Sequence, residues 1–442
     1  MRWVVAAGLL FLLALALQLG LLVFAAYVLI GVLGVSWLLA RSWTQHLYAE
    51  RRLVDQSAEI NDALDVAVVI RNTGPLPIPW VVAEDYLPPA ALRQRPPRLR
   101  VEGKRLRVML VWGRSSTRLR YTLVMLMRGF YQVGPVILEG GDLFGLYRRF
   151  RVETHPHFLL VYPRLVPLLG YDLSSRRPVG EIRLTHRLFE DPTRIAGVRE
   201  YQQGDPLNRV HWKATARTGV LHCKIYEPST IAGGTILLDF RREAYPTRGE
   251  PYRSELGITL AAALANTLYE MGQQFGLVTN ARDAADRLRA EGWQVHAGAF
   301  SDAAHNRRAA LAQAETPEAA DRLQPVVVPT RRGPEQFELL RETLARLELN
   351  DGLTLAELVG EAGSSLPGDA TVLAILAEAP PETALALGNL RRRGYAVTVF
   401  LLILDEQAGT LDWGRLLAEG LDVRHVPSEE AISGVCQAMA LR

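Results

Sequence analysis

The distribution of apolar and polar residues divides the chain into regions with different hydrophobic patterns. The first region is a long apolar run. From Trp3 to Ala40 no residue is charged. One helix of that length would measure roughly 57 Å, well beyond a bilayer core of about 30 Å. Gln18-Leu19-Gly20 divides the run into two halves, each long enough to span. The pattern therefore predicts a transmembrane helical hairpin over residues 1–41.

The charges that flank this hairpin predict its orientation. Arg2 precedes the first half, and Arg41, Arg51 and Arg52 follow the second, whereas the turn between the halves is uncharged. By the positive-inside rule both ends face the cytoplasm. We therefore expect a multi-pass protein of the inner (cytoplasmic) membrane with cytoplasmic soluble domains. A cleaved signal peptide ending near residues 14–16 is an alternative, in which the second half acts as a stop-transfer segment.

Short strand-like segments follow a juxtamembrane linker that we place at residues 42–59. Runs such as 64–72 and 116–124 are rich in β-branched residues, and turns containing glycine or proline separate the runs. Several short strands of this kind predict a small β-sandwich domain over residues 60–168. A signature segment, residues 169–232, connects it to the rest of the chain.

Strand and helix patterns alternate in the C-terminal region, residues 233–442. This order predicts a doubly wound, mostly parallel sheet with helices on both faces. Residues 281–324 are polar with weak apolar periodicity, so we expect an insertion there. The fold class is thus α/β plus all-β. The expected strands cover residues 235–239, 276–280, 370–376 and 395–404.

Composition and motifs narrow the possible functions. The chain has 50 Lys and Arg against 47 Asp and Glu, a net charge of +3, which argues against a dedicated nucleic-acid binder. Cys223 and Cys436 are the only cysteines, too few for a disulfide framework. The sequence has no GxxxxGK[ST] phosphate loop, no GxSxG elbow and no HExxH motif. We therefore expect a non-enzymatic protein with no cofactor and no small-molecule substrate.

Residues 199–219 pack many conformationally constrained residues into a short stretch. Gly204-Asp205-Pro206 predicts a turn into a helix, with Asp205 as N-cap and Pro206 in the first helical position. Gly219 predicts the C-terminal cap of the same helix. Such a helix would be short and would carry several basic residues.

The expected helix presents a cationic surface. Arg209, Lys213 and Arg217 are spaced at i, i+4 and i+8, so they would line one face. A solvated face with local salt bridges is one interpretation. The other is a surface that binds a partner or an anion, because Arg and Trp are favoured at interface hot spots. The candidate residues for that surface are Arg199, Asp205, Arg209, His211, Trp212, Lys213 and Arg217.

The same segment resembles the signature of a bacterial family called domain of unknown function 58. The resemblance covers most of residues 60–405, including the motifs around Arg128-Gly129, Asp142-Leu143-Phe144-Gly145 and Arg332-Gly333. It implies a membrane-tethered protein with a von Willebrand A-like domain and a MoxR-type AAA+ ATPase as partner. The resemblance implies no known reaction.

A metal site of the von Willebrand A type is degenerate in this sequence. Domains of that type that bind Mg²⁺ carry Asp-x-Ser-x-Ser after the first strand, which supplies the oxygen ligands the ion needs. Here Asp239 matches, but Arg241 and Glu243 occupy the serine positions. The third strand ends at Glu378 where an Asp is usual. We therefore expect no bound metal at the degenerate site of Asp239 and Glu243.

The favoured function is a membrane-anchored, cytoplasm-facing adaptor or scaffold that recruits a protein partner, by resemblance a MoxR-type AAA+ ATPase. The first alternative is a divergent metal-dependent hydrolase that uses the 205–239 region, with Asp205, His211 and Asp239 as its residues. The second is a metal-dependent ligand binder outside the cell, which needs the opposite topology.

Overall fold

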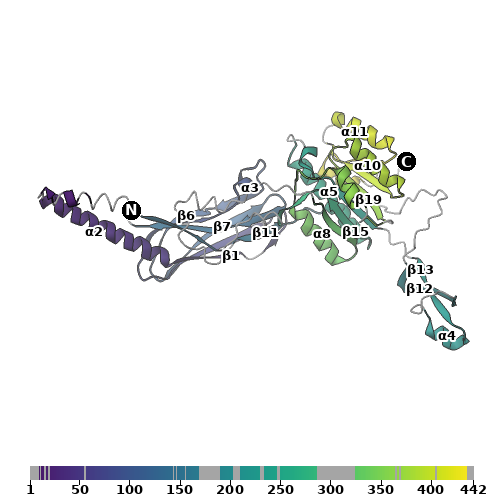
Figure 1. Ribbon diagram of the computed structural model, residues 1–442, viewed down its shortest axis with the longest axis horizontal. Coiled ribbons are helices and arrows are strands. Elements are labelled where there is room, and N and C mark those ends of the chain that lie inside the picture. Colours follow the sequence, from purple (N-terminus) through teal and green to yellow (C-terminus); the bar gives the residue numbers. More distant parts are fainter. Residues whose placement is uncertain are drawn as a thin grey trace. The chain divides into compact units, whose positions relative to one another are not determined.

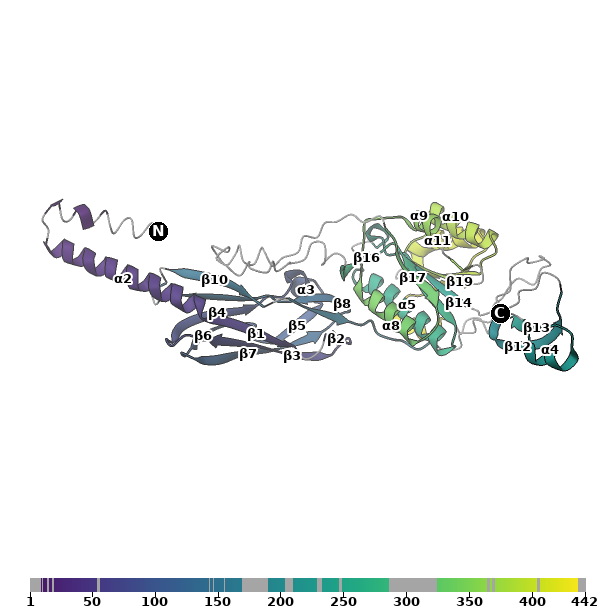
Figure 2. The same ribbon diagram turned by 60° about the horizontal axis from the view of Figure 1, so that its bottom comes forward.

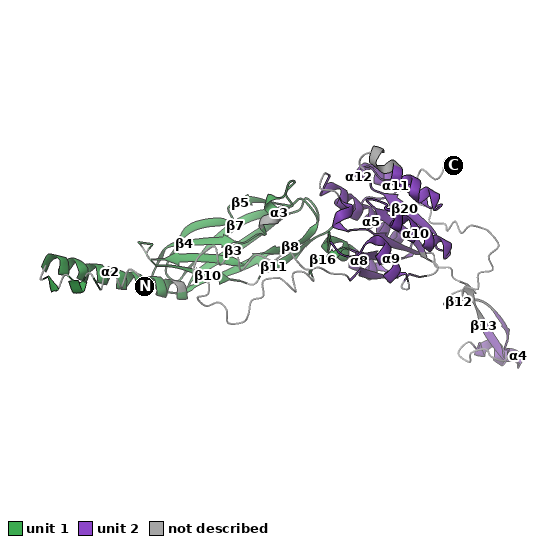
Figure 3. Ribbon diagram, turned by 45° about the horizontal axis from the view of Figure 1, so that its top comes forward, with its two compact units in different colours: residues 1–164, 281–322, 341–350 green, residues 165–280, 323–340, 351–442 purple. Residues whose placement is uncertain are grey.

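The computed structural model divides the chain into two compact units, coloured separately in Figure 3. Unit 1 contains residues 1–164, 281–322 and 341–350, and unit 2 contains residues 165–280, 323–340 and 351–442. The structure describes residues 9, 11–13, 16–17, 20–53, 56–142, 144–145, 147–154, 156–168, 190–202, 210–228, 233–245, 249–285, 324–363, 366–367, 370–403 and 406–435. Most of the insertion expected at 281–324 lies outside these residues.

The second half of the apolar run forms one helix, α2 (Gly20–Gln45), seen in Figure 1. It begins at the glycine that divides the run in the sequence. Its segment Gly20–Trp43 is long and apolar enough to cross a membrane, by length and composition alone. The first half of the expected hairpin falls mostly outside the described residues, so a hairpin is not seen.

Three β-sheets form the body of unit 1. Their strand orders are β1-β3-β7-β5, β10-β9-β4-β6 and β2-β11-β8, and all neighbours are antiparallel except β11 and β2. The elements are β1 (Leu47–Leu53), β2 (Ser57–Ala58), β3 (Ala63–Asn72), β4 (Ile78–Asp85), α3 (Pro89–Arg93), β5 (Leu99–Gly103), β6 (Leu106–Val111), β7 (Ser115–Met125), β8 (Gly129–Val133), β9 (Val136–Gly141), β10 (Arg148–Glu153) and β11 (His157–Val161).

The prediction of a linker at residues 42–59 is wrong over much of that segment. Helix α2 continues to Gln45, and Leu47–Leu53 forms β1, which pairs with β3 from Leu47↔Asn72 to Leu53↔Val66. The strand β1 is hard to recognise in the sequence because several of its residues are polar, and one of them, Arg51, is charged but buried.

The sheets pack face to face through buried aliphatic side chains. Val68 and Ile70 of β3 lie in one core with Val81 of β4 and Leu138 of β9. Trp43, from the last turns of α2, belongs to the same core. A second core joins the first sheet to β8 and β11. The end of helix α2 is therefore packed into the sandwich, and no flexible linker separates the two.

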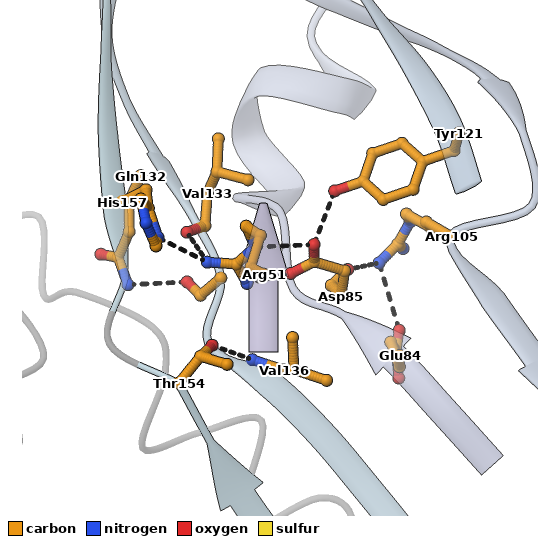
Figure 4. Close-up of polar contacts among 11 residues, drawn as sticks. Arg51, Glu84, Asp85, Arg105, Tyr121, Gln132, Val133, Val136, Thr154 and His157 are labelled. Atoms are coloured by element: carbon orange, nitrogen blue, oxygen red, sulfur yellow. Dashed lines mark hydrogen bonds and ion pairs between the residues drawn. The ribbon is translucent and has the colours of Figure 1, made fainter. Parts of the chain in front are cut away.

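A buried ion pair ties β1 into this body (Figure 4). Arg51 donates from Nε to Asp85 Oδ2 at 3.0 Å and from Nη1 to the Val133 carbonyl at 2.9 Å, and its Nη2 pairs with Asp85 Oδ1. Tyr121 donates its hydroxyl to Asp85 at 2.8 Å, and His157 Nδ1 lies 3.1 Å from Arg51 Nη1. Both charged side chains are 0% exposed. Arg51 is thus an internal residue, so its use as a membrane-flanking charge is wrong.

Unit 2 contains an open six-stranded sheet of order β17-β15-β14-β19-β20-β21. Neighbouring strands are parallel except for the edge strand β17, which is antiparallel to β15. The strands are β14 (Gly233–Leu238), β15 (Gln274–Thr279), β17 (Val326–Arg331), β19 (Ala370–Leu376), β20 (Val397–Leu401) and β21 (Asp422–His425). The four strands predicted from the sequence are thus confirmed as β14, β15, β19 and β20.

Helices cover both faces of this sheet (Figure 2). On one face, Leu237 of β14 packs in the core formed with α9, α10 and α11. On the other face, Leu238, the next residue of β14, faces α5, where a Cβ added to Gly257 would lie 3.7 Å from it. Phe337 of α8 stacks on Tyr269 of α5, with ring centroids 4.8 Å apart. The helices are α5 (Tyr252–Glu270), α8 (Pro334–Arg346), α9 (Leu355–Ala362), α10 (Pro381–Arg392), α11 (Glu406–Ala418) and α12 (Glu429–Gly434).

Candidate functional site

The signature segment folds as a β-hairpin that carries one short helix between its strands (Figure 1). We call this the signature hairpin: β12 (Glu190–Glu200), α4 (Trp212–Thr218) and β13 (His222–Pro228), with β12 and β13 antiparallel. Val210 forms an antiparallel bridge with Cys223.

Local hydrogen bonds define both ends of α4. His211 is the N-cap, and its Nδ1 accepts a hydrogen bond from the Ala214 amide at 3.0 Å. Gly219 closes the helix with φ 72°, and its amide donates to the Thr215 carbonyl at 2.9 Å. The predicted C-cap is therefore confirmed. The predicted start at Pro206 is wrong, because the chain reaches His211 from a β-bridge and not from a helix.

This start changes the expected cationic stripe. Asp205 and Arg209 lie outside the described residues, and a helix that begins at Trp212 cannot include Arg209. Lys213 and Arg217 keep their i, i+4 relation on α4, and both are exposed. The stripe therefore contains two helical cations instead of three.

An aromatic and aliphatic surface accompanies these cations. Helix α4 has no buried residue, and Trp212 is 69% exposed. Val198, Val220 and Leu221 of the same hairpin are also large exposed apolar residues. Arg199 is exposed on β12 and donates to the carbonyl of its neighbour Glu200. Exposed apolar side chains and exposed cations on the same small hairpin are a combination found at protein contact surfaces.

A second polar cluster lies where the central strands of the unit 2 sheet end. The Asp239 side chain is buried at the end of β14. Its Oδ1 accepts from Asn280 Nδ2 at 2.8 Å and from the Arg241 amide at 3.2 Å. Asn280, which follows β15, also donates to the Leu353 carbonyl and accepts from the Phe240 amide at 2.6 Å. The carboxyl ends of parallel strands are where α/β sheets bind ligands.

Burial controls the protonation of this cluster. It raises the pKa of Asp239, against the opposing effects of the Asn280 and Arg241 hydrogen bonds and of the Arg241 charge. Burial likewise raises the pKa of Glu378, which follows β19, while the Arg253 charge opposes the shift. A buried carboxylate costs stability when it is ionised.

Other side chains occupy the remaining positions of the degenerate metal site. Glu243 forms an ion pair with Arg241. Arg253, from the start of α5, donates to the carbonyls of Ala377 and Leu402, which follow β19 and β20. Among the described residues, no three His, Cys, Asp or Glu side chains gather in a group that could hold a metal ion.

Two residues of this cluster were not predicted as site residues. Asn280 is the last residue of a strand predicted from the sequence, at the edge of the sheet where polar side chains from several strands meet. Its position could therefore have identified it as a site residue. Arg253 lies in the first turn of the largely buried, Ala- and Leu-rich helix α5, and its sequence neighbours give no sign that it reaches two strand ends.

The residues of the hydrolase alternative have separate structural roles in the described part of the chain. His211 caps α4 with its ring nitrogen, and Asp239 accepts from Asn280 at the sheet. Asp205 lies outside the described residues.

Comparison with known proteins identifies relatives of the signature region. Residues 197–334 match the family model described as "Protein of unknown function DUF58". The uncharacterized protein YeaD of Bacillus subtilis (strain 168) is 25% identical over 258 residues, which are 58% of this chain and 61% of YeaD. The match thus spans less than two thirds of that relative.

Solved structures resemble only part of the chain. A CARDB domain from Pyrococcus furiosus is 13% identical, with a TM-score of 0.18, and covers 26% of this chain and 86% of that domain. Escherichia coli alpha-2-macroglobulin, from domain MG7 to its C-terminus, is 13% identical with a TM-score of 0.22, over 27% of this chain and 17% of that one. Neither score supports a transfer of function. Residues 197–334 thus match the DUF58 family of proteins of unknown function, and the similarity to YeaD supports the same resemblance.

Proposed function

We propose that this protein is a membrane-anchored scaffold that presents its soluble units at the cytoplasmic face of the inner membrane and recruits a protein partner there. The observation that carries the proposal is helix α2, whose apolar surface is exposed along most of its length. Leu21 is 86% exposed, Phe24 69% and Tyr27 61%, values that suit lipid rather than water as the surrounding medium.

The orientation rests on the flanking charges that remain at the surface. Arg41 lies over the Trp37 ring at 5.6 Å, an arrangement that suits the headgroup region. Arg52 is exposed on β1. With Arg2, these cations favour a multi-pass anchor whose two ends both face the cytoplasm, with the apolar run before Gly20 as the first span.

The sheet of unit 2 supports the proposal of a von Willebrand A-like domain. Its order places the first strand, β14, in the centre, with β15 on one side and β19 on the other. This reversal of strand order brings the ends of β14 and β19 together at the position where doubly wound folds bind ligands. In this chain Asn280 donates to Asp239 at the ends of β15 and β14, and Arg253 donates to the carbonyls of Ala377 and Leu402, which follow β19 and β20.

The partner that we propose is a MoxR-type AAA+ ATPase, and the signature hairpin is its docking surface. Trp212, Lys213 and Arg217 provide an exposed aromatic side chain beside two cations, a combination that suits an acidic surface with an apolar centre. The sequence has no phosphate loop, so the partner's nucleotide hydrolysis would supply the energy for any remodelling.

The test measures binding of a purified MoxR-type ATPase to the full chain in lipid nanodiscs. We expect Trp212→Ala and the pair Lys213→Glu, Arg217→Glu each to weaken binding by about tenfold or more, as hot-spot residues do. Reversal of Arg118 and Arg120, which are exposed on β7, is the matched control and should leave affinity unchanged. Equal affinity for all variants would contradict the proposal that the hairpin is the docking surface. If the wild type does not bind, the proposal of this ATPase as the partner is wrong.

A cytoplasm-only fluorescent reporter fused to the C-terminus tests the orientation separately. Fluorescence in intact cells is the expected result. A dark reporter whose fusion protein is stable and membrane-bound would contradict the cytoplasmic orientation while leaving the anchor in place.

A further inference from the structure

Three loops meet at one end of the sandwich in unit 1. They connect β3 to β4 (residues 73–77), β6 to β7 (112–114) and β9 to β10 (142–147), and we call them the loop rim. Asn72 Nδ2 donates to the carbonyls of Leu76 at 2.8 Å and Trp112 at 3.2 Å, which joins the first two loops. Trp80 Nε1 donates to the Asp142 carbonyl at 2.9 Å, which joins the third loop to β4.

Helix α2 enters the sandwich at this same end. The Thr73 amide donates to the carbonyl of His46, the residue just after α2, at 2.9 Å. Leu39 and Trp43 of α2 pack in the sandwich core, and the helix contacts β9 and β10. The loop rim therefore surrounds the exit of the apolar helix.

Each loop of the rim exposes a large apolar side chain. Leu76 is 48% exposed, Trp112 66% and Phe144 67%. Their backbones are held by hydrogen bonds, since Phe144 N donates to Asp142 Oδ2 and the Leu76 and Trp112 carbonyls accept from Asn72. Three separate loops at one end of the sandwich thus each expose a large apolar side chain on a backbone held by hydrogen bonds, which water does not stabilise.

Helix length places this patch at the level of the lipid surface. From Gly20 to Leu39 is about 20 residues, or about 30 Å of helix, which equals the thickness of the bilayer core. Leu39 packs against the sandwich core, and Leu33 and Ser36, one to two turns earlier in α2, are also buried. No spacer separates the apolar helix from the body, so loops around its exit lie at the headgroup layer.

Charge at the rim agrees with an anionic lipid surface. Arg41, Arg114 and Arg148 are all exposed at this end, and Arg148 also pairs with Glu139 at 3.6 Å. The acid among the rim loops, Asp142, is buried and accepts from the amides of Phe144 and Tyr147. Aromatic tips beside exposed arginines are typical of protein surfaces that sit at the membrane interface.

We infer that the loop rim is a lipid-docking surface, with Leu76, Trp112 and Phe144 inserted into the headgroup region of the bilayer that α2 crosses. This inference rests on the proposed membrane anchor. Docking through the rim gives the sandwich a second attachment besides its helix, and it fixes the tilt of the sandwich on the membrane.

The test places one environment-sensitive fluorophore at a time on the full chain, with both native cysteines replaced by alanine. The labelled variants are Trp112→Cys and Phe144→Cys in the rim, Lys104→Cys at the other end of β6 as control, and Leu29→Cys in the middle of α2. Each is reconstituted in nanodiscs of phosphatidylcholine and phosphatidylglycerol in equal amounts. Quenching is measured with doxyl near the headgroup for positions 104, 112 and 144, and with doxyl near the end of the acyl chain for position 29. Circular dichroism confirms that each variant is folded.

We expect labels at positions 112 and 144 to emit at shorter wavelength and to lose most of their intensity to headgroup-proximal doxyl lipid, while the label at 104 changes in neither respect. Quenching at 29 without quenching at 112 and 144 would overturn the inference and leave the anchor standing. Quenching at 112 and 144 without quenching at 29 would support docking and overturn the span. A blue shift without quenching would assign the rim to a protein contact and overturn lipid docking.

Discussion

The buried pair of Arg51 and Asp85 gives the sharpest stability prediction. The perturbation is Asp85→Asn, which keeps the size of the side chain and removes its charge. In the wild type, Arg51 donates to both Asp85 oxygens, and Tyr121 donates to one of them. The variant leaves a guanidinium with no exposed surface and no opposing charge.

The magnitude follows from this complete burial. Breaking a buried ion pair by removing one partner costs about 3–5 kcal/mol, because the remaining charge stays desolvated. Arg51 keeps its hydrogen bond to Val133, which holds it in place and prevents an easy escape to water. A loss of this size corresponds to roughly 10²- to 10⁴-fold more frequent opening of the sandwich.

Hydrogen exchange measured by mass spectrometry is the appropriate assay, because it reads the sandwich separately from unit 2. Amides of β3 and β7 should exchange faster by the factor given above, while those of β14 and β19 should not change. The matched control is Glu50→Gln, which breaks the exposed pair of Glu50 with Arg71 and should cost less than about 1 kcal/mol. An increase below about tenfold for Asp85→Asn would refute the reasoning, since it would mean that Arg51 is not confined.

Three further predictions concern single residues. Because burial raises the folded pKa of Asp239, the native state binds its proton more tightly, so wild-type stability should fall as pH rises from about 4 through that pKa. Asp239→Asn keeps the acceptor oxygen but cannot ionise. The urea concentration at which unit 2 of this variant unfolds should therefore not fall with rising pH, and at neutral pH it should be no lower than that of the wild type. Gly219→Ala forces a side chain into φ 72° and should destabilise α4 by about 1 kcal/mol, seen as faster amide exchange confined to the signature hairpin. Gly134→Ala would make a Cβ overlap the Arg51 guanidinium, and thermal unfolding should show a loss of about 3 kcal/mol in the sandwich. An unchanged midpoint would show that Arg51 can move.

Alternation of strand and helix patterns was enough to find the central sheet of unit 2, because parallel strands buried on both faces read as continuous apolar runs. The strand β1 could not be found this way. Its polar letters include Arg51, which becomes a core residue only through Asp85 on another strand. Because Asp85 is distant from Arg51 in the sequence, the residues around Arg51 give no indication that its side chain is buried.

The signature helix illustrates a different limit. Gly219 was recognised because a left-handed cap has one strongly preferred residue. The start was misplaced because Asp205 and Pro206 are good local signals, whereas the cap in use is the ring of His211. The bridge of Val210 to Cys223 sets that start, and a pairing with a later strand cannot be read from the residues before it.

The burial of Ala40 and Trp43 in the body of unit 1 has a mechanical consequence. A helix whose last turns are part of a β-sandwich cannot swivel independently of it. In the membrane-anchored arrangement proposed above, force applied to the sandwich would therefore reach the lipid as torque on the helix. The protein would then act as a lever with its fulcrum at the membrane surface.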